Sequence, residues 1–446
     1  MTVKSCVYLA ARMLFGRREG QRGSIRSAIV AVGLSLVPLV VVLQVSDGMI
    51  QGITSRFIET GTYHLQAIGR EDVSSQQLQE LQQRLSLLPG VTAIIPERQG
   101  IGLLYSDSGR TGATVRAVAP EIWQIDPGFR TYMEVQAGSF DLRGERSIVL
   151  GSQIARQLQA TPGDVIRLLT VRPGPGGAFL PRISSFTVSG VVSTGYQDLD
   201  RLWVYIPLER GLQVLAPGTA RQIIGIKIDD PYGIQNPIFS PRPDPATAAL
   251  VRSIRGELDA SWRLFSWYDL ERSRYMSFLT TKNLLIFIMI LIVCVAAVNI
   301  SSAMVMLIIE KRPEIAILKS VGATPNMIAL VFVLCGFFAG VVGALTGTAI
   351  GLLASVNVNQ ILAGIEWLLN LAAEGGGALL APFGAGEAPQ ISLFHSEYYL
   401  EQLPVSISLA ELIIAASLAI GLSSLAAWIP ARRAAAIRPI DVMRKH

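Results

Sequence analysis

The stretch 327–356, MIALVFVLCGFFAGVVGALTGTAIGLLASV, contains no charged side chain. A helix needs about 20 apolar residues to cross ~30 Å of hydrocarbon, so this stretch is long enough to span a membrane. Half of the chain is hydrophobic, only 16% is charged, and three more stretches are free of charge: 27–46, 283–309 and 412–431. We therefore predict an α-helical membrane protein with four transmembrane helices at these positions.

Basic residues orient these spans. No Lys or Arg occurs between Lys319 and Arg432, and the loop 357–411 between the last two spans has only acidic charges. Lys and Arg beside a span stay on the cytoplasmic side. The basic segments 1–26, 310–326 and 432–446 are therefore predicted to be cytoplasmic, both termini included, and 47–282 and 357–411 to lie outside. This topology accounts for the pI near 9.2, so no nucleic-acid partner is expected.

The outer segment 47–282 contains short strand and helix patterns that indicate an α+β domain inserted between the first two spans. One lobe is expected at about 60–118 and 222–268, interrupted by a β-rich insertion at about 119–221. Predicted helices are 76–88, 152–158 and 246–258. Predicted strands are 65–68, 101–105, 114–118, 147–150, 165–170, 185–192, 202–206, 223–228 and 262–267. Helical spacing continues beyond both flanking spans, which indicates two stiff levers or, alternatively, tilted or interfacial helices.

Nothing in the sequence indicates catalysis or a bound cofactor. No Lys follows a Gly, so there is no Walker-type phosphate loop, and neither H-E-x-x-H nor G-x-S-x-G occurs. His64, His395 and His446 are scattered, and the three cysteines show no metal-ligand spacing. The chain is predicted not to be an enzyme and to take its energy from a partner.

The cytoplasmic segment 310–326 is predicted to hold a short helix. Pro313 suits its first turn, and Gly322 suits the position just after its end. Such a helix would expose Ile315, Ile317, Leu318 and Val321, which either a partner or the chain's own span ends would cover.

This segment, K-R-x-E-I-A-I-L-K-x-x-G-A, resembles FtsX-like, MacB-type permeases of ABC transporters, and so do 430–434 and 438–444. The resemblance implies that the short helix docks on a cytoplasmic ABC ATPase, which binds the ATP and Mg that this chain does not. The residues that would make this contact are Glu314, Ile315, Ile317, Leu318, Lys319, Gly322 and Ala323.

The outer motifs at 117–121, 138–140, 148–151, 162–164 and 190–196 resemble the lipoprotein-releasing (LolC/LolE-type) permeases. The resemblance implies a Porter-like lobe and a Sabre-like insertion, in a protein of the bacterial inner membrane. It also implies that acylated lipoproteins are extracted and passed to a periplasmic carrier. A hairpin at 172–182 occupies the place where one subunit of that family captures the carrier, unless it is a plain hairpin. Its proposed contacts are Pro173, Pro175, Phe179, Leu180 and Pro181.

Two further sets are expected to act inside the membrane. Glycines aligned on one face of the third span indicate close helix packing, within the chain or in a dimer: Gly336, Gly340, Gly343, Gly347 and Gly351. Positions near the outer ends of the first two spans are candidates for a substrate cavity, with lipid contact as the alternative: Val45, Met49, Ile53, Phe278, Leu285 and Met289. After the third span, 361–371 with Trp367 is expected to form an amphipathic helix at the outer interface.

The function predicted from these residues is that of a permease subunit of a lipoprotein-releasing ABC complex. It would pair with a second permease subunit, either another copy or a paralogue. Two alternatives stay open: a MacB-like efflux subunit, and an FtsX-like relay of ATPase motion to a periplasmic cell-wall hydrolase.

Overall fold

A computed structural model describes residues 3–15, 22–69, 75–174, 179–234, 243–380 and 403–436. The chain divides into two compact units. The membrane unit comprises Met1–Met49, Ser277–Ile391 and Leu403–His446, and the extramembrane unit is formed mainly by Ile50–Met276.

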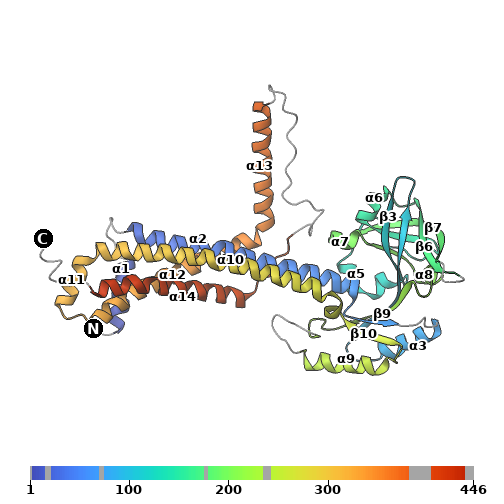
Figure 1. The fold of residues 1–446 in the computed structure, drawn as a ribbon, viewed down its shortest axis with the longest axis horizontal. Coiled ribbons are helices and arrows are strands. Elements are labelled where there is room, and N and C mark those ends of the chain that lie inside the picture. The colour runs from blue at the N-terminus through green and yellow to red at the C-terminus, as the bar shows by residue number, and fades with distance from the viewer. Residues whose placement is uncertain are drawn as a thin grey trace. The chain divides into compact units, whose positions relative to one another are not determined.

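Four helices of the described chain are long and apolar enough to cross a membrane, which confirms the four predicted spans. They are α2 (Arg22–Phe57), α10 (Trp267–Glu310), α12 (Pro325–Val356) and α14 (Leu409–Ala436). Within the membrane unit they lie side by side (Figure 1). Three shorter helices complete the unit: α1 (Val3–Phe15), α11 (Arg312–Ser320) and α13 (Val358–Leu380).

The four spans differ in how much of their apolar surface the chain itself covers. Half of the most apolar window of α12 is buried in the bundle, against 17% of that of α10. Phe332 and Cys335 of α12 meet Ala427 of α14 and Leu36 of α2 in a common core. Helix α1 packs against the same core through Cys6 and Ala10. Helix α12 is therefore central, and α10 leaves most of its surface uncovered.

Helices α2 and α10 both exceed what a bilayer requires. Helix α10 has 44 residues and α2 has 36, so they rise about 65 and 55 Å at ~1.5 Å per residue. The helical spacing read beyond each span is thus realised as continuous helix. Helix α2 passes directly into a π-helical turn, η1 (Ile58–Thr62), a geometry that is frequent at functional sites.

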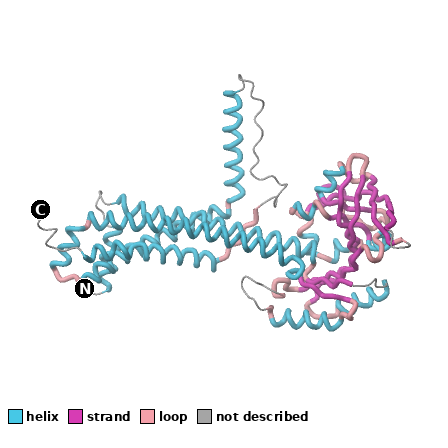
Figure 2. The backbone as a smooth tube through the Cα atoms, viewed as in Figure 1, coloured by secondary structure: helices cyan, strands magenta, loops and turns pink. Residues whose placement is uncertain are grey.

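The extramembrane unit is built on one ten-stranded sheet (Figure 2). Its order is β10-β1-β9-β2-β3-β8-β5-β7-β4, and β6 pairs with β2 and β7. The strands are β1 (Leu65–Gly69), β2 (Val91–Tyr105), β3 (Arg110–Val118), β4 (Glu134–Gly138), β5 (Ser147–Gly151), β6 (Val165–Pro173), β7 (Phe179–Ser193), β8 (Trp203–Pro207), β9 (Ala220–Ile228) and β10 (Trp262–Ser266). Its helices are α3 (Ser75–Ser86), α4 (Ile122–Ile125), α5 (Pro127–Thr131), α6 (Ser152–Leu158), α7 (Gln197–Asp200), α8 (Leu208–Val214) and α9 (Pro245–Glu257).

The sheet does not break where the two predicted lobes meet. Strand β3 was assigned to the first lobe, yet it pairs in parallel with β8 of the insertion. Its Val115 and Ala117 pack in the same core as Ile148 of β5. A separate core joins α3 and α9 to β1 and β9 through residues such as Leu85 and Ile254. Strand β2 is long enough to belong to both parts of the sheet, so the sheet continues across the lobe boundary expected at 118/119.

Local corrections are small. The strand expected at 262–267 ends at Ser266, since Trp267 begins α10. Strand β2 starts at Val91, and β4, α4 and α5 were not predicted. The outer segment 357–411 was treated as a loop containing one amphipathic helix at 361–371, and α13 extends that helix to Val358–Leu380. Residues 381–402, the tail from 437 onward and Pro175 lie outside the described residues.

Candidate functional site

Helix α11 has the local geometry expected of it. Its first turn contains a proline, and Lys311 donates to Glu314 at 2.6 Å. Its end is closed by Gly322 with φ of +96°, a conformation that glycine adopts without strain. Lys319 donates to the carbonyl of Ala435 at 2.7 Å, so the helix is fixed to the end of α14.

The exposed face of α11 differs from the predicted one. Ile317 is 63% exposed and Val321 83%, but Ile315 is only 1% exposed. Ile315 lies in the bundle core with Ile328, and Leu318 and Ala323 are half-buried. The expectation that Ile315 faces outward was wrong, because one face of this helix must cover the ends of the spans. Ile317 and Val321 remain as an apolar pair on the outside.

The hairpin β6–β7 presents an apolar face. Its register pairs Pro173 with Phe179, and Val171 with Pro181. Paired residues point to the same side, and so do residues two apart in a strand. Five exposed residues therefore share one face, which we call the hairpin face: Val171, Pro173, Phe179, Pro181 and Ile183.

Leu180 lies on the opposite side of the hairpin, with Arg172 and Arg182. Arg182 donates to the carbonyl of Gln213 at 2.7 Å, which fixes that side to α8. The sequence reading grouped Leu180 with Phe179 and missed Val171 and Ile183. Strand alternation would have separated them once the register was known.

None of the six proposed cavity residues is an exposed side chain. Ile53 is 3% exposed, and Met289 packs against the bundle core. An exposed stripe of α10 lies about 100° around the helix from Phe278, Leu285 and Met289. It follows a spacing of four and three residues: Leu284, Ile288, Leu291, Val295 and Val298. The candidates were chosen by depth along the span, and depth does not determine the face of a helix.

The five aligned glycines of α12 face helices of the same chain. A Cβ on Gly336 would stand 2.4 Å from that of Ala427 in α14. A Cβ on Gly347 would stand 2.6 Å from the carbonyl oxygen of Gly33 in α2. Gly340 likewise faces Ser423, whereas Gly343 and Gly351 face Val32 and Val40. The absence of side chains allows three spans to approach closely.

A charged cluster, which we call the outer cluster, joins three spans near the point where α2 and α10 leave the membrane unit. The Lys282 ammonium of α10 donates to Asp47 of α2, and to Glu411 of α14 at 2.8 Å. The side chain of Lys282 is 7% exposed, and each carboxylate is 17% exposed. One cation faces two anions, so this outer cluster has one excess negative charge when all three are ionised. Beside it, buried Gln44 accepts from the backbone N–H of Ser408 at 3.1 Å.

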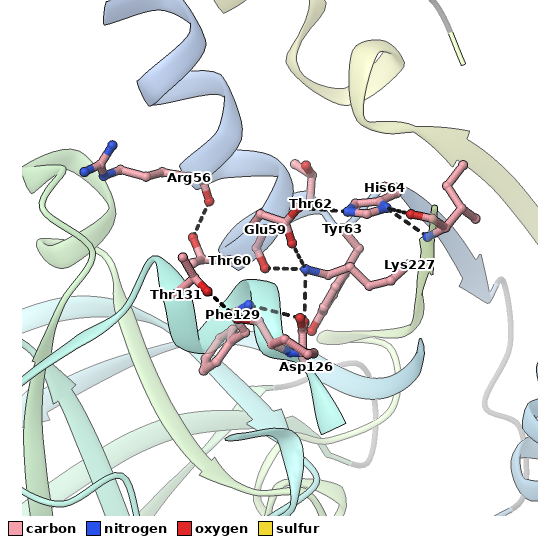
Figure 3. A network of polar contacts seen from close by, with 12 residues as sticks. Arg56, Glu59, Thr60, Thr62, Tyr63, His64, Asp126, Phe129, Thr131 and Lys227 are labelled. Atoms are coloured by element: carbon pink, nitrogen blue, oxygen red, sulfur yellow. Dashed lines mark hydrogen bonds and ion pairs between the residues drawn. The ribbon is translucent and has the colours of Figure 1, made fainter. Parts of the chain in front are cut away.

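A second network holds the end of α2 within the extramembrane unit (Figure 3). Lys227 of β9 is bonded to Glu59 of η1, and its Nζ lies 3.0 Å from Asp126, next to α5. His64 Nδ1 accepts a hydrogen bond from the backbone N–H of Ile228 at 2.8 Å. The other ring nitrogen, Nε2, therefore donates to Glu59 at 3.1 Å. Glu59 is therefore held by His64 and by Lys227, and Lys227 also joins it to Asp126 beside α5.

Arg116 lies at the centre of the sheet with no exposed surface. Its Nε and Nη2 donate to both oxygens of Glu97, at 2.7 and 2.6 Å, and its Nη1 donates to the carbonyl of Thr60. Burial raises the pKa of Tyr63, whose hydroxyl donates to the same carboxylate at 2.5 Å. Burial alone would lower the pKa of Arg116, but the Glu97 carboxylate holds it well above its usual value. These contacts of Arg116 tie η1 to β2 and β3.

Sequence reasoning missed the outer cluster, the network around Glu59 and the contacts of Arg116. The available signal was a single charge inside an apolar pattern, as with Lys227 between Ile226 and Ile228, or Arg116 in β3. A charge buried in a strand needs a partner, although its identity comes only from the fold. Lys282 was read only as the boundary of a span.

Two family models match the chain. Residues 28–236 match the MacB-like periplasmic core domain, and residues 286–439 match the FtsX-like permease C-terminal domain. The first match covers most of α2 and most of the sheet, and the second covers most of α10 together with α12 and α14.

Curated relatives match over almost the whole length. The lipoprotein-releasing system transmembrane protein LolC of Neisseria meningitidis is 27% identical, over 94% of this chain and 93% of its own. The corresponding LolE of Haemophilus influenzae is 24% identical, over 96% and 97%. Among solved structures, the periplasmic region of MacB from Actinobacillus actinomycetemcomitans is 15% identical with a TM-score of 0.29, covering 47% of this chain and 92% of that one.

Proposed function

We propose that this chain, whose residues 28–236 match the MacB-like periplasmic core domain and whose residues 286–439 match the FtsX-like permease C-terminal domain, is the membrane subunit of a lipoprotein-releasing ABC complex. The observation that supports this best is the full-length similarity to relatives named for that system, which spans both units. The cargo would be acylated lipoproteins of the inner membrane, and a separate ATPase would supply the energy. Both termini and α11 would then face the cytoplasm, as the basic flanks indicate.

Helix α11 is suited to receive the motion of the ATPase. Ile317 and Val321 form an uncovered apolar pair, and Lys319 and Ile315 anchor the helix to the bundle. A push on the exposed side is therefore passed to the span ends rather than absorbed by a loose loop.

The exposed stripe of α10 is the surface that we assign to the second permease subunit and to the acyl chains. It has large apolar side chains, and the chain itself leaves them uncovered. Helix α10 is continuous from Trp267 to Glu310, so a tilt of its membrane part reaches its far end. The outer cluster at Lys282 sets how easily α10 leaves α2.

The hairpin face would receive the periplasmic carrier. Phe179 is 67% exposed and Ile183 66%, and exposed apolar anchors on a rigid strand pair are typical of binding surfaces. The fixed opposite side, held through Arg182, keeps that face presented.

The first experiment places a photo-crosslinking amino acid at position 317 in cells and identifies the crosslinked and co-purifying molecules by mass spectrometry. Position 315, which is buried in the chain's own core, is the matched control. We expect an ABC ATPase at 317 alone, with triacylated lipoprotein in the purified complex. An ATPase with a cell-wall hydrolase and no acylated cargo would favour the mechanical relay. Absence of any ATPase would overturn the proposal.

A second experiment tests the hairpin face by the transfer of lipoprotein to a soluble carrier in reconstituted vesicles. Phe179→Asp and Ile183→Asp are expected to lower transfer at least tenfold while ATPase activity stays unchanged. Leu180→Asp, on the opposite side, is the control and should transfer normally. If all three variants lowered transfer equally, or if none of them changed it, the carrier would not bind the hairpin face.

A further inference from the structure

Helix α13 has an apolar surface that the described membrane unit leaves open. It begins at Val358, and only Asn357 separates it from the end of α12. Trp367 is 63% exposed, and four aliphatic side chains are 42 to 57% exposed: Ile361, Ile365, Leu368 and Leu371. A group of exposed apolar side chains such as this one marks a surface that contacts a membrane, a protein or a ligand.

The side chains of α13 divide into two stripes. Asn359, Glu366 and Asn370 follow a helical spacing of seven and four residues and form a polar stripe. Ile361, Ile365, Leu368 and Ala372, spaced by four, three and four, lie on the opposite side at about 100° per residue. Trp367 lies near the border between the stripes, the position that aromatic side chains prefer between lipid and water.

The first turn of α13 is fixed to the outer end of the bundle. The Asn359 side chain donates to the carbonyl of Leu403 at 3.2 Å and accepts from its N–H at 3.1 Å. Val358 is 8% exposed. The polar stripe thus begins against the segment that leads into α14. Figure 1 shows α13 running across the direction of α12, and a helix that leaves a membrane span crosswise runs along the bilayer surface.

Lipid is the occupant that the surrounding surface favours. Near the start of α13, Ile350, Leu353 and Val356 of the span α12 are 56 to 66% exposed, so the surface beside the α13 stripe is one that a bilayer would cover. The sequence has no Lys or Arg between Lys319 and Arg432, so attraction to anionic headgroups is absent. Contact with the bilayer would depend on apolar burial alone.

We propose that α13 is an interfacial helix whose Ile361, Ile365, Leu368 and Ala372 stripe is embedded at the acyl boundary of the outer leaflet, with no requirement for anionic lipid. This inference depends on the four spans and not on lipoprotein release. It gives the third and fourth spans an anchor in the membrane plane.

The test uses the full chain in phosphatidylethanolamine–phosphatidylglycerol vesicles, in a Cys294→Ala background that leaves the buried Cys6 and Cys335 in place. Leu368→Cys on the apolar stripe and Glu366→Cys on the polar stripe are each labelled with an environment-sensitive fluorophore. Nitroxide-labelled acyl chains are expected to quench the label at 368 at least threefold more than the label at 366.

Three outcomes would overturn the inference. Equal quenching at the two positions would mean that α13 does not lie in the interface. A label at 368 that is shielded from aqueous quenchers but not quenched by lipid would mean that protein covers the stripe. If quenching at position 368 disappeared when phosphatidylglycerol was omitted, anionic headgroups would be required for α13 to bind the membrane. An unchanged ratio without phosphatidylglycerol is the supporting result.

Discussion

In the membrane unit, spans approach each other closely at glycines, as where Gly347 of α12 meets Gly33 of α2. In the extramembrane unit, by contrast, the centre of the sheet buries an arginine, Arg116, with a carboxylate and three aromatic rings. The bilayer offers spans no hydrophobic reason to associate, so close van der Waals contact must hold them. A water-exposed domain gains from apolar burial throughout and tolerates a buried ion pair that fixes its geometry.

The largest effect is expected from removing Arg116. Arg116→Leu leaves the Glu97 carboxylate, 1% exposed, without its cation, which costs about 3 to 5 kcal/mol of unfolding free energy. Hydrogen exchange of the β2 and β3 amides in the full chain measures the loss locally.

The double variant Arg116→Leu/Glu97→Leu removes both charges and is expected to recover much of that stability. Arg143→Leu, which breaks the exposed pair with Asp141, should leave the exchange unchanged. A double variant as weak as the single one would show that packing, and not charge, is what Arg116 provides.

The next effect tests the glycine contacts of the bundle. Gly347→Val places a side chain against backbone atoms of Gly33, which have no room to yield, and overpacking of this kind costs about 1 to 3 kcal/mol. A lower thermal unfolding temperature of the full chain in nanodiscs is the expected result. Gly421→Val in α14, where an added Cβ meets nothing within 4 Å, is the matched control. Similar losses in both variants would mean that helix propensity, rather than close approach, explains the glycines.

The outer cluster at Lys282 combines features of the two units, because here the membrane bundle contains a buried ion pair. Lys282→Met leaves Asp47 and Glu411 facing each other with little water, at a cost of about 1 to 3 kcal/mol. We expect α10 to separate from α2, measured as a broader spin–spin distance distribution between labels on the two helices. Lys282→Arg keeps the charge and should keep the narrow distribution. An unchanged distribution in Lys282→Met would show that apolar packing alone holds α10.

The same contrast explains what the sequence could predict. Spans follow from length and hydropathy because hydrocarbon imposes both, and α6 and α11 follow from local spacing and end signals. The hairpin follows from its flanking strands. These features depend on neighbouring residues, so a single sequence contains them.

Features that depend on distant partners were beyond the sequence. Ile315 was expected outside and lies inside, because the covering spans are not local to it. Lys227 and Lys282 each find their carboxylates more than 100 positions away. The continuity of the sheet across the expected lobe boundary was beyond the sequence for the same reason, since only the pairing of β3 with β8 shows it.

The smallest expected effect is a pH dependence in the extramembrane unit. Burial raises the pKa of Asp200, although Ser193 and Thr194 donate to it at 2.6 to 2.8 Å and oppose the rise. A raised folded pKa means that the folded state binds more protons than the unfolded state between the ordinary and the raised value. The contribution of Asp200 to stability is therefore present at low pH and is lost as pH rises through that window.

Asp200→Asn should remove this loss, and the measured quantity is the difference in unfolding free energy between the two proteins from about pH 4 to about pH 7. We expect wild type to lose stability relative to the variant as pH rises, whatever constant offset the lost acceptor oxygen adds. Asp141→Asn is the control of opposite sign, because hydrogen bonds from Arg143 lower the pKa of Asp141. There, wild type should gain relative to the variant as pH rises through the acidic range. The opposite result would be a stability difference that changes with pH in the same direction for Asp200 and Asp141. It would mean that hydrogen bonds, rather than burial, determine the pKa of Asp200. A buried carboxylate of the sheet would then be stabilised in the same way as the exposed Asp141.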